Sequence, residues 1–213
     1  MQSALGEMRA AMANQRKCIS LCEAEVTSSP ASAEIRGNLG VAYFRYGEML
    51  EKLSSAKEAL QYYQKAVDIE RALSLADPTD AEKSGDLSED LMKVADMSLK
   101  LGDAASARAG YRQALEIREF LVAANPAYVD GRSQVAQIYE KLGGYYAQQA
   151  SKKFPPTQSA GNWREAKRWY QQSLRVWTDL QQHKRVASDY TNKPGEISRQ
   201  LAKCDTPIAR LYQ

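Results

Sequence analysis

The hydrophobic positions of this chain follow a helical period. Between residues 56 and 75 the apolar side chains recur at spacings of three and four and form one stripe, with charged residues such as Glu70 mostly between them. No segment alternates apolar and polar residues with a period of two between hairpin turns. The pattern therefore predicts an all-α protein. The stripe consists of Ala59, Leu60, Tyr63, Ala66, Val67, Ile69, Leu73 and Leu75.

The same pattern repeats along the chain every 48 residues. Proline occupies positions 30, 78 and 126, and alanine occupies positions 11, 59 and 107. The next equivalent alanine is Ala166, which lies 59 residues after Ala107 and so predicts an insertion of 11 residues in the last unit. We place the insertion at residues 151–162, where Pro155, Pro156 and Gly161 cannot continue a helix. This segment is predicted to be a loop.

Each unit has room for two helices of about 20 residues. The three repeated prolines follow Ser, Asp or Asn, which predicts a capping side chain directly before a proline at the first helical position. Short connections predict antiparallel neighbours. The predicted helices span residues 3–27, 31–53, 55–76, 79–101, 103–124, 127–150, 162–183 and 195–211. They predict one repeat domain over 1–213, with an unpaired first helix 3–27, repeats 31–76, 79–124 and 127–183, and a capping helix 195–211.

Several short motifs resemble the tetratricopeptide repeat. Leu39-Gly40 followed by Tyr43 is similar to the first helix of that repeat. The pattern of its second helix occurs twice, as Ala59, Tyr63, Ala66 and Pro78 and as Ala107, Tyr111, Ala114 and Pro126. The resemblance implies a right-handed α-solenoid of antiparallel helix pairs with about eight helices, used as a protein-binding scaffold.

The units here are longer than the usual tetratricopeptide repeat of 34 residues. Their length resembles the long-helix variety in the C-terminal regions of bacterial serine/threonine protein kinases, and residues 162–180 are most similar to that group. No kinase motif is present in the chain. The resemblance implies that the module is part of a bacterial signalling protein.

Charge and composition narrow the expected partners and location. Lys and Arg number 29 and Asp and Glu 26, and no basic cluster would neutralise a row of phosphates, so we expect no nucleic-acid partner. No apolar stretch reaches the ~18 residues of a membrane span, so we expect no membrane insertion. Three cysteines, an odd number, indicate reduced thiols and a cytoplasmic protein.

Few side chains are suited to catalysis or to cofactor and metal binding. His183 is the only histidine, so a catalytic triad or a histidine metal site would lack partners, and we expect it to be solvated or to cap a helix end. Asp86, Glu89 and Asp90 are acidic neighbours near the predicted start of a helix, where we interpret them as complementing its dipole. The sequence predicts no enzyme activity, no cofactor and no metal.

The predicted partner-binding surface is the wall formed by the first helix of each pair. With Leu39, Leu87 and Val135 packed inward, helical geometry gives this wall mixed charge and two apolar anchors, Phe44 and Met92. We expect a protein or peptide to bind there. The predicted partner-binding residues are Phe44, Arg45, Glu48, Glu89, Met92, Lys93, Asp96, Gln137, Glu140 and Lys141.

An alternative function is self-association. Trp169 and Trp177, or the unpaired first helix, could form the contact of a homodimer, because tryptophan is enriched at interfaces. The same two tryptophans could instead pack against the predicted inserted loop or the terminal helix. The sequence leaves both interpretations open.

Overall fold

The computed structural model describes residues 2–152, 156–183, 185 and 187–209. These residues form eight α-helices and one 3₁₀-helix, with no strand among them, so the predicted all-α helical repeat is confirmed. Where the sequence predicted one domain, the contacts divide the chain into two compact units, Met1–Gly110 and Tyr111–Gln213, and each unit is described by itself. No helix in the described ranges is long and apolar enough to cross a bilayer.

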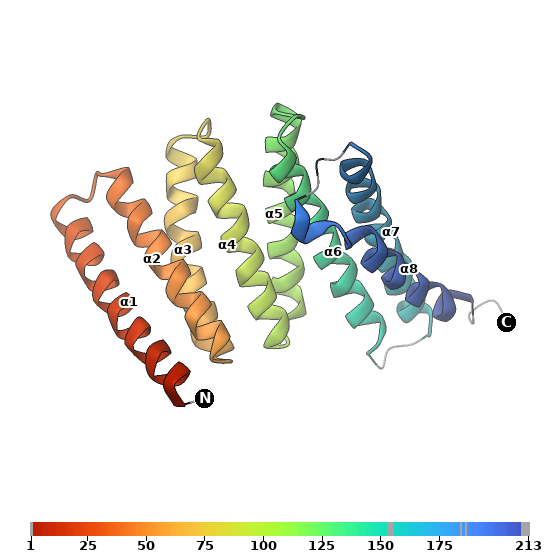
Figure 1. Cartoon of the computed structure of the whole chain (residues 1–213), viewed down its shortest axis with the longest axis horizontal. Helices are drawn as coiled ribbons and strands as arrows, with labels where there is room; N and C mark the ends of the chain where they lie inside the picture. Colours follow the sequence, from red (N-terminus) through yellow and green to blue (C-terminus); the bar gives the residue numbers. More distant parts are fainter. Residues whose placement is uncertain (1, 153–155, 184, 186, 210–213) are drawn as a thin grey trace. The chain divides into compact units, whose positions relative to one another are not determined.

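The first four helices of unit 1 form a stack in which each packs against the next (Figure 1). The first helix is fixed to the second by a hydrogen bond from Gln15 to the Ala42 carbonyl, at 3.0 Å, and by one from the Tyr43 hydroxyl to Glu23, at 2.6 Å. Its helices are α1 (Gln2–Ser28), α2 (Ala33–Lys52), α3 (Ala56–Ala76), α4 (Ala81–Lys100) and the first part of α5 (Ala104–Ala124).

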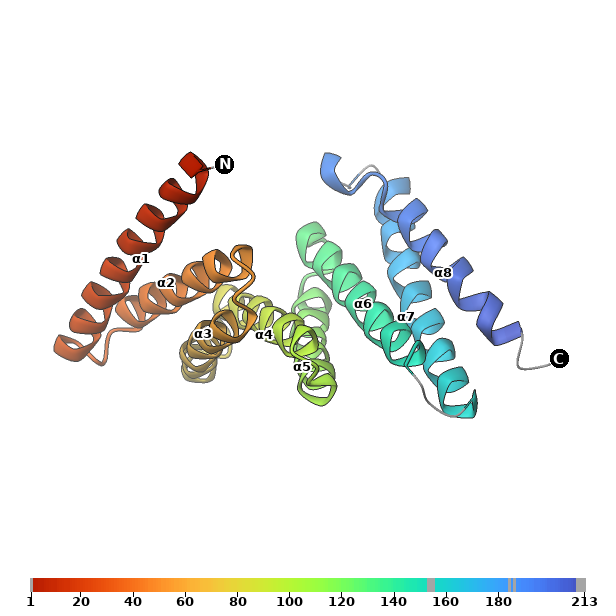
Figure 2. The same ribbon diagram turned by 90° about the horizontal axis from the view of Figure 1, so that it is seen from below.

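Unit 2 continues from the second part of α5, and in it α7 lies between α6 and α8 (Figure 2). The Ser173 hydroxyl donates to the Ala136 carbonyl at 2.9 Å and joins α7 to α6. Lys167 pairs with Asp205 and joins α7 to α8. The remaining elements are α6 (Val129–Ala150), α7 (Pro156–Gln182), the 3₁₀-helix η1 (Ser188–Tyr190) and α8 (Lys193–Ala209).

The predicted helix starts at the repeated prolines are wrong. α2, α4 and α6 each begin three residues after their proline, at Ala33, Ala81 and Val129. The caps are instead side chains directly before two of these helices: Ser32 accepts from the Ile35 N–H at 3.3 Å and Asp80 from the Lys83 N–H at 3.0 Å. These bonds satisfy N–H groups that the first helical turn leaves free, so the prolines lie in the preceding turns.

The predicted loop over residues 151–162 is also wrong for its second half. α7 begins at Pro156, because a proline has no N–H to leave unsatisfied in the first helical turn. The remaining part of the predicted loop includes residues 153–155, which lie outside the described residues. The last helix begins at Lys193 instead of 195, and positions 210 and 211 of its predicted end also lie outside the described residues.

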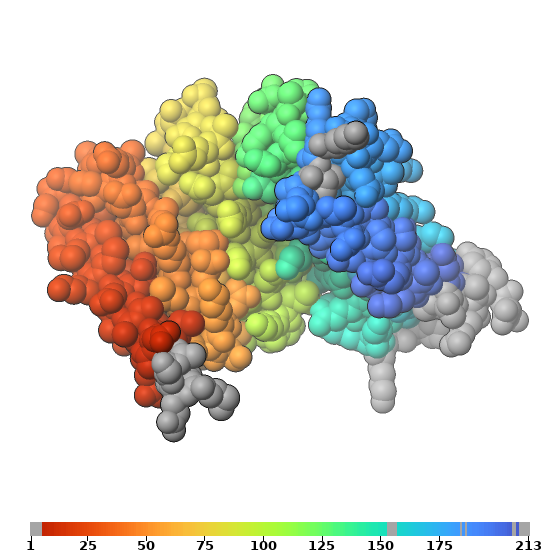
Figure 3. Space-filling model, viewed as in Figure 1, coloured from red at the N-terminus to blue at the C-terminus, as the bar shows by residue number. Residues whose placement is uncertain are grey.

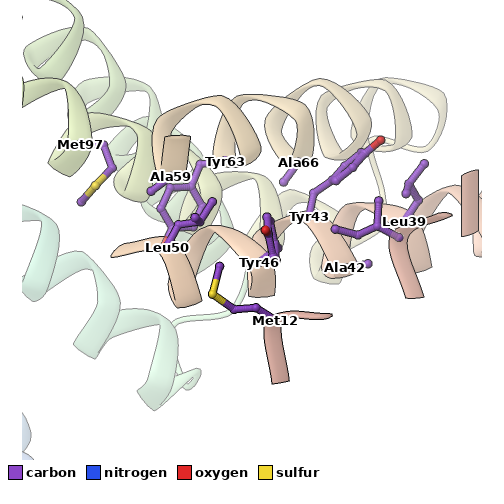
Figure 4. Close-up of a cluster of buried hydrophobic side chains, with 11 residues drawn as sticks. Met12, Leu39, Ala42, Tyr43, Tyr46, Leu50, Ala59, Tyr63, Ala66 and Met97 are labelled. Carbon is purple, nitrogen blue, oxygen red and sulfur yellow. The ribbon is translucent and has the colours of Figure 1, made fainter. Parts of the chain in front are cut away.

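Several positions 48 residues apart share the same environment. Ala59 and Ala107 are fully buried, as are Ala66 and Ala114. Ser54 follows the end of α2 and Gly102 follows the end of α4. Both residues have a positive φ, of 62° and 89° respectively. Figure 4 shows the core of unit 1, in which Tyr63 lies beside Leu50 and Ala59. The repeat inferred from the sequence therefore corresponds to a structural repeat.

Candidate partner-binding site

The predicted binding residues of unit 1 lie on α2 and α4, which Figure 1 shows in front of α3. Lys93 of α4 pairs with two carboxylates of α2, those of Glu51 at 3.2 Å and Glu48 at 3.9 Å. Phe44 is half-buried and packs against Tyr63 at a tilt of 58°, with ring centroids 5.4 Å apart. The structure therefore brings Glu48 and Lys93 together as an ion pair and fixes Phe44 against the core.

The other predicted residues of unit 1 differ in exposure. Arg45 and Glu89 are exposed, whereas Met92 and Asp96 are half-buried. The face thus offers two exposed charges of opposite sign with a partly accessible apolar surface between the helices. We refer to the surface of Phe44, Arg45, Glu48, Glu89, Met92, Lys93 and Asp96 as the α2–α4 face.

The three predicted residues of unit 2 lie on α6 and have a different setting. Lys193, the first residue of α8, places its Nζ 3.2 Å from both carboxylate oxygens of Glu140. Gln137 is half-buried and Lys141 is exposed. Figure 3 shows side chains of α8 over part of α6. Because Lys193 of α8 already pairs with Glu140, Glu140 is a poorer candidate for partner binding than the residues of the α2–α4 face.

A cavity of about 70 Å³ opens between α2, α3 and α4 in unit 1. Its α2 wall is apolar, and its α3 and α4 walls are acidic. Phe44 and Glu89 of the α2–α4 face border it, so the cavity is continuous with the predicted binding surface. We call it the acidic cavity. It is lined by Gly40, Val41, Phe44, Glu70, Asp86, Glu89 and Asp90.

Glu70 is the deepest acid of this cavity. Only 2% of its surface is exposed, and its Oε2 atom has no hydrogen-bond partner. A Cβ atom at Gly40 would lie 2.7 Å from its Oε1 atom, so the missing side chain of Gly40 makes room for the carboxyl group. The sequence interpretation placed Glu70 among the charged residues that lie mostly between the apolar positions. Its spacing of four from Ala66 and three from Leu73 places it on the apolar stripe and could have identified it.

Asp90 contradicts the interpretation that the acidic neighbours on α4 complement the helix dipole. It is the tenth residue of α4, well beyond the first turn within which the dipole acts, and only 4% of its surface is exposed. Burial, with smaller contributions from Glu70, Asp86 and Glu89, raises the pKa of Asp90 to about 8. Asp86 itself pairs with Lys83 at 3.5 Å. The acids line a cavity instead of a helix start.

Burial also dominates the ionisation of Glu70. It raises the pKa of Glu70 to about 7, although the nearby Lys83 ammonium acts in the opposite direction. Desolvation disfavours the charged form of a carboxyl group, so both buried acids are protonated at mildly acidic pH. Between pH 6 and 9 the cavity therefore gains negative charge.

This ionisation predicts that unit 1 loses stability as the pH rises. In the unfolded chain Glu70 and Asp90 ionise near pH 4, whereas in the folded chain they retain their protons up to pH values of about 7 and 8. The folded state binds more protons across this window, so the free energy of unfolding should fall by several kcal/mol from pH 5 to pH 9. Urea unfolding at the two pH values measures the change.

Paired variants assign this pH effect to the two acids. Glu70→Gln combined with Asp90→Asn should remove most of the pH dependence, because neither amide ionises. Glu82→Gln, at an exposed position of the same helix α4, should retain it. An unchanged pH dependence in the double variant would show that other groups cause the loss of stability.

The tryptophans and the histidine pack within unit 2. Trp177 has no exposed surface and stacks on Tyr190 of η1, with ring centroids 5.2 Å apart. Trp169 is half-buried and lies against Tyr139 at 5.7 Å. Trp177 thus packs against the segment that leads into α8 and offers no surface for a dimer contact. His183 is exposed, with its Nδ1 2.8 Å from the Asp179 carbonyl at the end of α7.

One comparison with known protein families finds a match within unit 1. A tetratricopeptide repeat model matches residues 41–73, the segment of α2 and α3 that contains Phe44 and Tyr63. Across the described residues, no group of three or more His, Cys, Asp or Glu side chains is arranged to hold a metal ion. A search of the curated proteins finds no match.

Solved structures are similar to this chain in fold. BtubC (BKLC) from P. vanneervenii is 16% identical, with a TM-score of 0.50, over 99% of this chain and 78% of that chain. The de novo designed helical repeat protein DHR64 is 8% identical, with a TM-score of 0.39, over 97% and 98% of the two chains. MamA is 11% identical, with a TM-score of 0.34, over 98% and 95%.

The fold and the match together define the class of this chain. It is an all-α helical-repeat protein of the solenoid type, and its residues 41–73 match a tetratricopeptide repeat. The predicted resemblance to tetratricopeptide proteins is confirmed at this level. The closer resemblance to the C-terminal regions of bacterial kinases stays a prediction.

Proposed function

We propose that this chain is a protein-interaction scaffold that binds a protein or peptide on the α2–α4 face of unit 1. The observation that carries the proposal is the acidic cavity, which opens beside Phe44 and Glu89. Exposed charges at the rim and a partly buried aromatic anchor are the combination expected of a protein-binding surface. An amphipathic helix or an extended peptide could lie along the two helices.

We further propose that the scaffold serves a bacterial signalling protein and acts in the cytoplasm. The support for the signalling context is the sequence resemblance of residues 162–180 to kinase-associated repeats. Self-association is the second candidate, and the observation that favours it is on α1. There Leu21 is 57% exposed, whereas Ile69, 48 residues later, is half-buried.

Site-specific crosslinking tests the binding face. The photo-reactive amino acid p-benzoylphenylalanine replaces Arg45, which is exposed on α2, or Gln61, which is exposed on α3, and the chain is irradiated in a lysate of its source cells. We expect a discrete protein adduct from position 45 and none from position 61. The combined substitutions Phe44→Ala and Met92→Ala should reduce the adduct at least fivefold, because they remove the apolar anchors.

Matched surface variants serve as the control. Lys57→Ala and Gln64→Ala, both at exposed positions of α3, should leave the adduct from position 45 unchanged. Adducts of equal yield at both positions, or an adduct that is insensitive to the anchor substitutions, would contradict binding on the α2–α4 face.

A further inference from the structure

We propose that the acidic cavity receives a lysine side chain of the partner protein, with its ammonium group against the carboxylates of Glu70 and Asp90. This inference rests on the proposed function and specifies the chemistry of the partner. It concerns a contact that the sequence did not predict, since Glu70 was not among the expected binding residues.

Charge complementarity favours a cation. Four carboxyl groups line the cavity, those of Glu70, Asp86, Glu89 and Asp90. The neighbouring Lys83 pairs with Asp86 at 3.5 Å and also acts on Glu70. The four lining carboxyl groups outnumber this one positive charge, so the cavity can accept another cation. A cationic side chain is the protein group that reduces their mutual repulsion.

The unsatisfied Oε2 atom of Glu70 indicates that a hydrogen-bond donor is missing from the cavity. Buried polar atoms in proteins nearly always have a partner, because an unsatisfied one loses its interaction with water. Glu70 lines the cavity, and only 2% of its surface is exposed. Its Oε2 atom has no hydrogen-bond partner. An ammonium group entering the cavity would donate to this oxygen.

The walls of the cavity favour lysine. Gly40, Val41 and Phe44 form an apolar wall, which suits the four methylene groups of a lysine stem. Glu70 and Asp90 belong to different helices, α3 and α4. A compact ammonium group with three rotatable donors can serve carboxylates from two directions, whereas the rigid planar fork of arginine matches one carboxylate side-on.

A peptide titration tests the assignment on the full chain. The probe is the pentapeptide acetyl-Gly-Gly-Lys-Gly-Gly-amide, added to ¹⁵N-labelled protein at pH 8.5, where lysine is charged and both acids are largely ionised. We expect saturable shifts of the Gly40 and Val41 amide signals. The same peptide with norleucine, which keeps the stem without the charge, should bind at least tenfold more weakly.

Protein variants locate the binding. Glu70→Gln and Asp90→Asn, tested separately, should each weaken lysine-peptide binding at least fivefold, and the dispersion of the amide spectrum reports whether each variant folds. Glu82→Gln, at an exposed position of α4, should not change it. Binding should also weaken at least threefold at pH 6, where both cavity acids are protonated. Two acid variants are used so that a folding failure in one leaves the other as the test.

Three results would overturn the lysine assignment. The first is equal binding of the lysine and norleucine peptides. The second is equal or tighter binding of an arginine peptide, and the third is full binding by both folded acid variants. The crosslinking at position 45 separates these failures from failure of the proposed function. If the adduct forms while the lysine peptide does not bind, the scaffold function stands and the lysine pocket is wrong; if no adduct forms, the scaffold function fails whatever the peptide does.

Discussion

Gly47→Leu is expected to lower the free energy of unfolding by about 3 kcal/mol, because overpacking a tight core site forces side chains off their preferred positions. A Cβ atom at Gly47 would lie 2.8 Å and 2.9 Å from the Tyr63 ring atoms Cε1 and Cδ1. The ring has no space to move away. Tyr63 is fully buried, its hydroxyl donates to Glu51 at 2.9 Å, and the Phe44 ring packs against it.

Urea unfolding followed by far-UV circular dichroism measures the loss. The matched control is Gly6→Leu on α1, where an added Cβ meets no atom within 4 Å. The control should gain up to about 1 kcal/mol, since leucine favours a helix more than glycine does. If Gly47→Leu behaves like Gly6→Leu, then α2 and α3 do not approach each other as closely as described.

The close approach at Gly47 belongs to the part of the fold that the sequence predicts well. Gly143 lies against Tyr170 in the same way in unit 2, where an added Cβ atom would be 2.7 Å from the ring. Small residues and aromatic residues recur at a fixed spacing because helix pairs pack alike in each repeat. Local periodicity therefore identifies the helices, their buried faces and the positions where two helices are closest.

The features of the site that the sequence does not predict are contacts between residues far apart in the chain. Glu140 belongs to the predicted binding wall by helical geometry, yet Lys193, 53 residues later, pairs with it. The acidic cavity likewise combines Gly40, Glu70 and Asp90 from three helices. No single-helix pattern relates such residues. The starts of two helices were predicted imprecisely because the capping residues are Ser32 and Asp80. The sequence had predicted that the residues before the prolines would be the caps.

Trp177 shows how a residue that the sequence leaves ambiguous becomes a strong test of the structure. It lies on α7, stacks on Tyr190 of η1 and is fully buried. Its Nε1 atom is buried without a hydrogen-bond partner. The indole therefore stabilises unit 2 through its packing alone, and its N–H group makes no favourable contribution.

Trp177→Ala should lower the free energy of unfolding by about 4 kcal/mol, the usual cost of removing a large buried aromatic side chain and leaving a cavity. Trp177→Phe should cost only about 1 kcal/mol. It keeps most of the apolar contact and removes an N–H group whose burial without a partner is itself unfavourable. Urea unfolding, followed by circular dichroism in the three proteins, measures both differences.

Trp163→Ala is the matched control on the same helix, because Trp163 is only half-buried. Its cost should be about 1 to 2 kcal/mol, in proportion to the smaller buried area. Equal losses for Trp163→Ala and Trp177→Ala would mean that η1 does not cover Trp177. A loss in Trp177→Phe as large as that in Trp177→Ala would mean that the indole N–H has a bonded partner. The two substitutions at position 177 thus separate packing from hydrogen bonding at the place where the C-terminal helix joins the repeat.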